Sequence, residues 1–288
     1  MAASVVGADR EGVMTRYGRH FYKLSGSGND FVFVDARTEP AGVLEQPATV
    51  WAVCARATGV GADGVVFVEP PRNADEKFSI RYLNRDGSLA LLCGNASLCS
   101  VRVAVELGIV GEGEEFVFGT GAGPARGRFT SDGPEIDLQP LGDLSASTSF
   151  ETRAGEQRIG FAMVGVPHVV ILCEDVDSVD IEGRGRPIRH DPRLAAGANV
   201  NFVSARPDGS WTMRTYERGV EAETLACGTG SVATAALLEK WGRSGSATTI
   251  WTRSGMPLRV RFRETQAGVV TPSLNGEGRI VFRGELAS

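Results

Sequence analysis

The feature that most constrains this chain is a short pattern that occurs twice, 134 residues apart, in a sequence of 288 residues. In each copy a strand-like segment ends at a tyrosine, and eleven residues later come a cysteine, a glycine, a polar residue, a small residue and a serine. The copies run from Tyr82 to Cys93 and from Tyr216 to Cys227. A repeat of nearly half the chain indicates a duplicated domain. We therefore expect two related halves that meet about a pseudo-twofold axis, with both thiols facing one cleft.

The residues that follow each cysteine predict a helix that begins close to the thiol. Helical periodicity covers 96–107 and 231–241, each directly after a glycine-containing turn, and a further helix is predicted over 49–58. Strands are predicted over 20–24, 31–35, 64–69 and 78–83. Unpaired N–H groups at a helix start lower the pKa of a thiol from about 8.5 towards neutrality. A single free cysteine is often just a core residue, but two in the same position of a repeat favour a catalytic pair.

Composition and charge argue against several classes of function. The net charge of −5 and the pI near 5.4 disfavour a nucleic-acid binder, which usually presents a basic face. The first residues lack the pattern of a secretory signal, and the longest apolar runs are too short to cross a bilayer. Five cysteines, an odd number, fit a reducing compartment. No cysteine or histidine cluster has metal-ligand spacing. We expect a cytoplasmic protein that binds no nucleic acid, membrane or metal.

Two thiols on opposite sides of a cleft suit the inversion of an amino-acid α-carbon. One thiolate removes the α-proton from one face while the other thiol donates a proton to the opposite face. Most enzymes that do this use pyridoxal phosphate, which needs a Schiff-base lysine. The chain has only Lys23, Lys77 and Lys240, and none lies in either repeat. Chemistry without a cofactor is therefore predicted, with backbone donors at Gly94-Asn95 and Gly228-Thr229 holding the substrate carboxylate.

Several motifs occur in an order that resembles the diaminopimelate epimerase family. They are Gly26-Ser-Gly-Asn29-Asp-Phe31, Gly59-Val-Gly-Ala-Asp63-Gly64, Asn84-Arg-Asp86-Gly87-Ser88, Cys93-Gly94-Asn95, Pro167-His168, Asn199-Val-Asn-Phe202, Tyr216-Glu217-Arg218-Gly219 and Glu223-Thr-Leu-Ala-Cys227-Gly228-Thr229-Gly230. The resemblance runs from about Tyr22 to the C-terminus, and the ordered set is specific although no single motif is. It implies an isomerase that interconverts LL- and meso-diaminopimelate, on the route to lysine and to peptidoglycan precursors.

The resemblance also implies a fold. This is an α/β (α+β) fold of two pseudo-symmetric domains, each a β-barrel-like sheet around a central helix, with the active-site cleft between them. Residues 1–14 are then an N-terminal extension, 15–138 form the half with Cys93, and 139–277 form the half with Cys227. The C-terminal strand, 278–288, is expected to return to the first half and complete it. The oligomeric state is left open, with a homodimer as one option.

The resemblance further assigns roles to individual residues. Cys93 and Cys227 are the acid–base pair, and His168 and Glu217 are neighbours that assist proton transfer at the thiols. The residues assigned to the substrate are Asn29, Asn84, Asn199, Glu217 and Arg218, which bind its distal end and orient the reacting one, and Gly94, Asn95, Gly228 and Thr229, which hold the reacting carboxylate. A guanidinium grips a carboxylate at two points, although a Glu-Arg pair is also common on surfaces. Asn84 equally suits a hairpin turn, and Asp63 is left outside the site.

The chain departs from the family pattern at four places. Leu98 stands where many relatives have arginine, Val166 where many have asparagine, and Gly64 where some have a polar residue. The segment between Arg218 and Cys227 is one residue longer than the commonest pattern. We expect these changes to alter affinity or choice of substrate, while the two-thiol chemistry is retained.

Other functions remain open at this stage. A racemase for proline or hydroxyproline keeps the same chemistry, but a small cyclic substrate has no distal zwitterion for Arg218 and the three asparagines. An isomerase that uses a carboxylate is disfavoured by the two matched cysteines. From another class, a thiol redox or sensor protein would join Cys93 and Cys227 in a disulfide.

Overall fold

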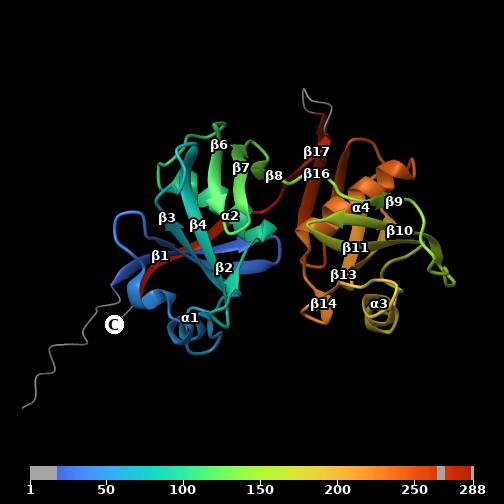
Figure 1. Cartoon of the computed structure of the whole chain (residues 1–288), viewed down its shortest axis with the longest axis horizontal. Helices are drawn as coiled ribbons and strands as arrows, with labels where there is room; N and C mark the ends of the chain where they lie inside the picture. Colours follow the sequence, from blue (N-terminus) through green and yellow to red (C-terminus); the bar gives the residue numbers. More distant parts are fainter. Residues whose placement is uncertain (1–17, 92, 265–269, 287–288) are drawn as a thin grey trace, which may run out of the picture.

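The computed structural model describes residues 18–91, 93–264 and 270–286, so the predicted extension over residues 1–14 lies outside it. Within the described part the strands belong to one hydrogen-bonded network. This network forms two lobes, each with one long helix inside it (Figure 1). The prediction of two α/β halves, each built around a central helix, is confirmed.

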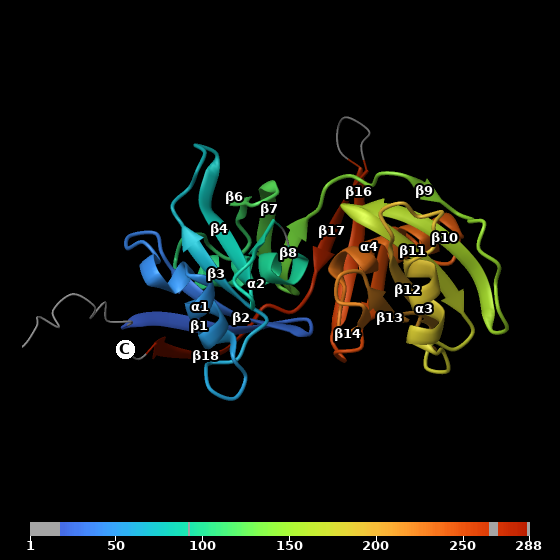
Figure 2. The same cartoon turned by 60° about the horizontal axis from the view of Figure 1, so that its bottom comes forward.

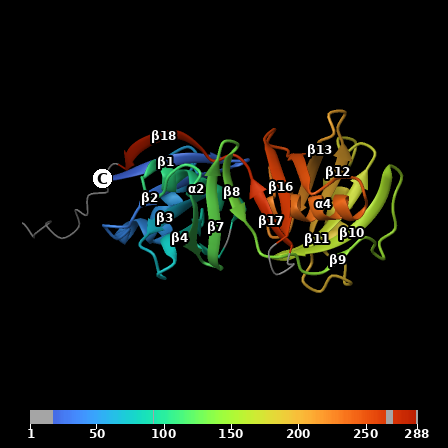
Figure 3. The same cartoon turned by 90° about the horizontal axis from the view of Figure 1, so that it is seen from above.

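The first lobe contains the N-terminal strands and the last strand of the chain. Its strands are β1 (Arg19–Gly26), β2 (Asn29–Asp35), β3 (Gly64–Glu69), β4 (Glu76–Asn84), β5 (Leu89–Ala90), β6 (Glu115–Thr120), β7 (Gly123–Thr130), β8 (Gly133–Asp137) and β18 (Arg279–Leu286). β18 pairs antiparallel with β1, and the two lie side by side in Figures 2 and 3. The strands surround α2 (Gly94–Glu106), while η1 (Gly42–Glu45) and α1 (Pro47–Cys54) bury a separate apolar cluster against the sheet.

The second lobe repeats this arrangement around α4 (Gly228–Lys240). Its strands are β9 (Leu144–Ser145), β10 (Glu156–Val164), β11 (Val166–Cys173), β12 (Asn199–Ala205), β13 (Trp211–Glu217), β14 (Ala222–Thr224), β15 (Ala247–Trp251), β16 (Pro257–Glu264) and β17 (Val270–Asn275). Its outer helix α3 (Ile181–Arg189) was not predicted, because two internal glycines and Pro187 disfavour a helix. It is stabilised by the Asp180 side chain, which caps its first turn, and by an ion pair between Arg184 and Glu156 of 2.7 Å.

The central helices are buried on nearly every side, as expected of a helix inside a sheet. Both predicted helices are present and begin two or three residues earlier than predicted, directly after the cysteines. The helix predicted over 49–58 begins at Pro47 and ends at Cys54. Among the described residues no helix is long and apolar enough to cross a membrane.

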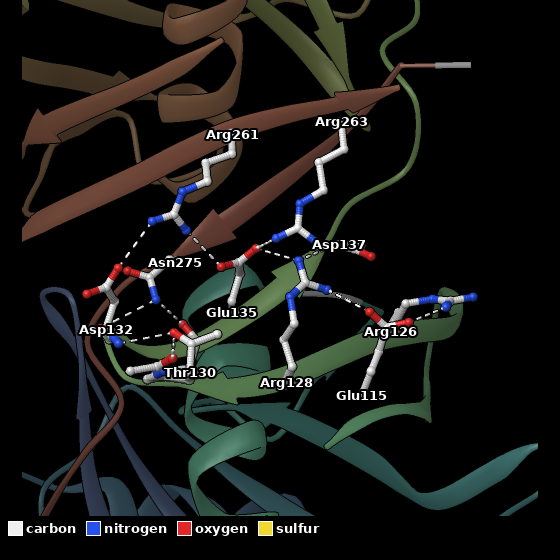
Figure 4. Close-up of polar contacts among 12 residues, drawn as sticks. Glu115, Arg126, Arg128, Thr130, Asp132, Glu135, Asp137, Arg261, Arg263 and Asn275 are labelled. Carbon is white, nitrogen blue, oxygen red and sulfur yellow. Dashed lines mark hydrogen bonds and ion pairs between the residues drawn. The ribbon is translucent and has the colours of Figure 1, made fainter. Parts of the chain in front are cut away.

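The lobes are joined by strand pairing between β8 of the first and β17 of the second, with Leu274 opposite Ile136. A cluster of ion pairs lies on this junction (Figure 4). At its centre the buried carboxylate of Glu135 accepts hydrogen bonds from Arg128 of β7 and from Arg261 and Arg263 of β16. The relative placement of the lobes therefore depends on main-chain pairing together with a buried charge.

The ladder register shows which positions of the two lobes correspond. In the first lobe Tyr82 pairs with Ala90, three positions before Cys93. In the second lobe Thr215 pairs with Thr224, three positions before Cys227. Tyr82 therefore corresponds to Thr215 and not to Tyr216. The equal tyrosine-to-cysteine spacing in the sequence arises because the second hairpin is one residue longer, and its turn contains Glu221 at a φ of 59°. The cysteines are equivalent, but the interpretation that pairs the tyrosines is wrong.

Candidate active site

A cleft of about 740 Å³ is lined by residues of both lobes, a volume typical of small-molecule sites. The predicted residues that line it are Asn29, Asn84, Cys93, Gly94, Asn95, Asn199, Glu217, Arg218, Cys227, Gly228 and Thr229. His168 is the exception, since its side chain is wholly buried one layer behind the lining. The structure thus brings together predicted residues that are up to 200 positions apart in the sequence.

The two thiols lie at equivalent places on the floor of this cleft. Cys93 and Cys227 are the N-cap residues of α2 and α4, each in an extended backbone conformation. The helix starts approach closely, because a Cβ atom added to Gly94 would lie 4.0 Å from the Cα atom of Gly228. A Cβ atom on Gly228 would lie 3.0 Å from a methyl group of Leu274. A side chain at Gly228 would therefore require Leu274 to shift, whereas the space at Gly94 is less tight.

Burial raises the pKa of both thiols. The pKa of Cys227 rises to about 12 by burial and the nearby Glu217 carboxylate, against hydrogen bonds from the Gly230 N–H and the Thr229 hydroxyl. Burial likewise raises the pKa of Cys93, although backbone N–H groups lower it. The expectation that the helix starts bring the thiols near neutrality is wrong, because burial outweighs the N–H groups. Both thiols are therefore protonated at neutral pH.

A chain of amide hydrogen bonds crosses the Cys93 side of the cleft. Asn29 Nδ2 donates to Asp63 Oδ2 at 2.9 Å, and Asn95 Nδ2 donates to Asn29 Oδ1 at 2.7 Å. This leaves the buried Oδ1 atom of Asn95 with no partner among the described residues. Asp63, which sequence reasoning left outside the site, therefore orients both amides from behind the lining.

The charged groups of the described lining are Glu217 and Arg218 alone. They do not face each other as a surface pair, because Arg218 Nη1 donates to the carbonyl oxygen of Ala196 at 2.9 Å, and Glu217 Oε2 accepts from the Thr224 hydroxyl at 2.7 Å. The Arg218 N–H donates to Asn199 Oδ1 at 2.8 Å. Burial raises the pKa of Glu217. One cation and one carboxyl group beside several amides match a substrate end that carries both an ammonium and a carboxylate group.

Asn84 closes the hairpin turn that the sequence indicated and also lies at the cleft. Its carbonyl accepts the Gly87 N–H at 2.8 Å, and its side chain donates to the Ser88 hydroxyl at 3.0 Å, so it closes the hairpin turn. The same residue lines the cleft. The turn thus positions a cleft residue.

Tyr82 and Leu274 also line the cleft and were not predicted. The Tyr82 ring packs edge-on against Phe31, with 5.6 Å between centroids, and a Cβ atom on Gly64 would lie 2.4 Å from it. The departure at Gly64 therefore makes room for Tyr82. Of the other substitutions, Val166 lines the cleft and Leu98 is in the core.

The fold of two duplicated lobes is shared with solved structures that include a hydroxyproline epimerase and a probable proline racemase. The structure superposes on the hydroxyproline epimerase of Agrobacterium vitis with a TM-score of 0.61 and 19% identity, over 93% of this chain and 92% of that one. It superposes on a phenazine biosynthesis protein of Bacillus anthracis with a TM-score of 0.70 and 14% identity, over 94% and 99% of the two chains. These likenesses show the fold alone.

Sequence comparison is more specific. The family model for diaminopimelate epimerase matches residues 21–140 and 160–285. The chain is 49% identical over 278 residues to the diaminopimelate epimerase of Gemmatimonas aurantiaca, covering 93% of this chain and 99% of the relative. It is 40% identical over 277 residues to that of Aquifex aeolicus, covering 93% and 97%. The chain belongs to the diaminopimelate epimerase family, and the resemblance inferred from its motifs is confirmed.

Proposed function

We propose that this chain interconverts LL- and meso-diaminopimelate by proton transfer between Cys93, Cys227 and the substrate α-carbon. The observation that carries the proposal is the convergence of two helix-start thiols on one cleft, beside the charged side chains of Glu217 and Arg218. The relatives named diaminopimelate epimerase support the choice of substrate.

The proton transfer needs one thiolate and one thiol. Because burial raises the pKa of both groups, the ionised form needs a nearby positive charge. The α-ammonium group of a bound substrate supplies that charge, so ionisation and substrate binding are coupled. The thiolate then takes the α-proton from one face while the other thiol gives its proton to the opposite face.

The negative charge that develops on the α-carbon spreads into the adjacent carboxylate. The N–H groups at the starts of α2 and α4, at Gly94-Asn95 and Gly228-Thr229, hold this carboxylate and need no rearrangement during the reaction. At the other end of the substrate Arg218 binds the distal carboxylate, with Asn84 and Asn199 beside it, while Glu217 accepts from the distal ammonium group.

The test is α-proton exchange in D₂O, followed by NMR, with LL-diaminopimelate and reduced protein free of metal and added cofactor. We expect deuterium at the α-carbon and formation of the meso isomer. Cys93→Ala and Cys227→Ala should abolish epimerisation, and the serine variants should retain only slow, one-sided exchange. Cys54→Ala is the control, since Cys54 is buried in the outer apolar cluster of the first lobe.

Two outcomes would redirect the proposal. Exchange of hydroxyproline in preference to diaminopimelate would keep the mechanism and change the substrate. Wild-type turnover by Cys93→Ala or Cys227→Ala would rule out the two-thiol mechanism. A redox protein would instead cycle its thiols without any amino acid; the five cysteines of this structure are all free.

We further propose a cytoplasmic location and a homodimer. The location is supported by the free, odd-numbered cysteines. The dimer is supported by Val281 and Phe282 of β18, whose side chains are nearly half exposed. Light scattering on the purified chain should give twice the chain mass, and a monomer at micromolar concentration would contradict the dimer.

A further inference from the structure

Asn201 of β12 is a wholly buried polar residue with no part in the chemistry described above. Its Nδ2 atom donates to the carbonyl oxygen of Val169 at 3.2 Å and lies 3.2 Å from Nδ1 of His168. Its Oδ1 atom accepts from the Thr215 hydroxyl at 2.9 Å. Asn201 thus connects three strands of the second lobe behind the Cys227 half of the cleft.

These contacts determine which way the amide points and which ring nitrogen of His168 carries hydrogen. A carbonyl oxygen can only accept, so the atom facing Val169 must be the Nδ2 of Asn201. The same NH₂ group therefore donates to His168 Nδ1, which must accept. In a neutral imidazole the other nitrogen, Nε2, then carries the hydrogen. Burial, with the charge of Arg218 as a further cause, lowers the pKa of His168 to about 3, so the ring is neutral at pH 7.

The Nε2 atom of His168 is buried and has no hydrogen-bond partner among the described residues. Unpaired buried donors are rare in native proteins. This atom is next to the cleft. Val166, two residues before His168 in β11, lines the cleft, and so does Asn199, which pairs with His168 in β12. The Nε2–H group of a neutral ring is thus without a partner among the described residues, next to residues that line the cleft.

The other lobe shows that the fold does not require the polar triad formed by His168, Asn201 and Thr215. By ladder register, the positions of His168, Asn201 and Thr215 correspond to those of Phe31, Val66 and Tyr82 in the first lobe. There the same space is filled by packing, with the Phe31 and Tyr82 rings edge to face. The triad is therefore an addition to the half of the site that carries Cys227.

Asn201 also contacts the start of the helix that holds this thiol. A Cβ atom on Gly230 would lie 2.4 Å from Asn201 Oδ1 and 3.0 Å from Cys227 Sγ. The Gly230 N–H itself donates to that sulfur at 3.3 Å. The amide that orients the histidine is thus packed against the residue that donates to the thiol.

We propose that Asn201 is a positioning residue that fixes His168 as the Nε2–H tautomer and so supplies a neutral donor to the Cys227 half of the cleft only. The two half-sites are then chemically unequal, although their thiols are equivalent in the fold. The kinetic consequence rests on the proposed function, whereas the tautomer does not.

The test is the tautomer of His168 in protein labelled with ¹⁵N at histidine, read from two-bond ¹⁵N–¹H correlations at neutral pH. The chain has three histidines, and the exposed His20 and His190 serve as internal references. We expect the Nε2–H pattern for His168 in the wild type. Asn201→Asp offers His168 only acceptors and should convert the ring to the Nδ1–H form or the cation.

Thr215→Val is the matched control. It removes the hydrogen bond to Oδ1 but leaves the Val169 carbonyl to orient the Asn201 amide, so the Nε2–H tautomer should persist. An Nδ1–H ring in the wild type, or an unchanged tautomer in Asn201→Asp, would overturn the inference.

Kinetics supply the second measurement. Because Asn201 does not line the cleft, Asn201→Asp should lower kcat for epimerisation on the order of 10²-fold while KM changes little. A switched tautomer with unchanged kcat would overturn the role in catalysis. If the wild type exchanges no α-proton at all, the proposed function fails, and the tautomer still decides the inference about Asn201.

Discussion

Replacing Glu135 by glutamine tests whether the charge cluster at the junction stabilises the protein (Figure 4). The Glu135 side chain is 1% exposed and accepts from Arg128, which is 9% exposed, and from Arg261 and Arg263, each at 2.9 Å. Glutamine keeps the shape but removes the charge, and its NH₂ group then faces guanidinium donors. Arg128 would retain its contacts of 2.9 Å to Asp137 and 3.4 Å to Glu115.

The expected magnitude follows from burial. Breaking a buried ion pair by removing one partner costs about 3–5 kcal/mol, because the other charge is left without compensation. Since Asp137 still faces Arg128, we expect the lower end, about 3 kcal/mol. For a chain of this size that corresponds to a fall in Tm of about 5 °C. Glu115→Gln is the matched control: Glu115 pairs with Arg126 and, at 3.4 Å, with Arg128, but it is 45% exposed, so the loss of its charge should cost less than about 1 kcal/mol.

The pH dependence gives the reasoning an internal check. Burial raises the pKa of Glu135, but its hydrogen bonds and the charges of Arg128 and Arg263 lower it by more, so the net shift is downward. A depressed carboxyl pKa stabilises the folded state above the unfolded value of about 4.3, and this stabilisation is lost as pH falls through the folded value. The Tm difference between wild type and Glu135→Gln, measured by circular dichroism, should therefore be largest at pH 7 and shrink below pH 4. Equal Tm values at pH 7, or a difference that grows on acidification, would refute the argument.

Three further predictions concern the cleft. Because the pKa of Cys227 is raised to about 12, its alkylation by iodoacetamide without substrate should accelerate about tenfold per pH unit from pH 7 to pH 9; a plateau in that range, seen by mass spectrometry, would contradict the burial effect. Glu217→Gln removes a charge that raises the pKa of the thiol, so alkylation of Cys227 at pH 8 should become faster, and a slower reaction would count against it. Asn29→Ala breaks the chain from Asp63 to Asn95 and should raise KM for diaminopimelate about tenfold, the equivalent of one hydrogen bond; an unchanged KM would mean that Asn95 is oriented in another way.

The parts of this protein that the sequence determines are those set by neighbouring residues. A cysteine, a glycine and a polar side chain before an amphipathic segment are a local signal for a helix start, and α2 and α4 begin where that signal lies. The hairpin at Asn84 and the convergence of the cleft residues also follow from motifs and their duplication. The extra residue near Glu221 shows the limit of such reasoning, because equal spacing matched Tyr82 with the wrong partner.

Only the tertiary structure decided the properties that depend on contacts between distant segments. Whether a helix-start thiol has a raised or lowered pKa depends on how deeply Cys227 is buried, which no neighbouring residue reveals. The tautomer of His168 depends on an amide 33 positions away, and the junction depends on pairing between Glu135 and arginines more than 120 positions away. Sequence patterns record short-range hydrogen bonding and periodicity, whereas desolvation and charge pairing exist only once the chain has packed.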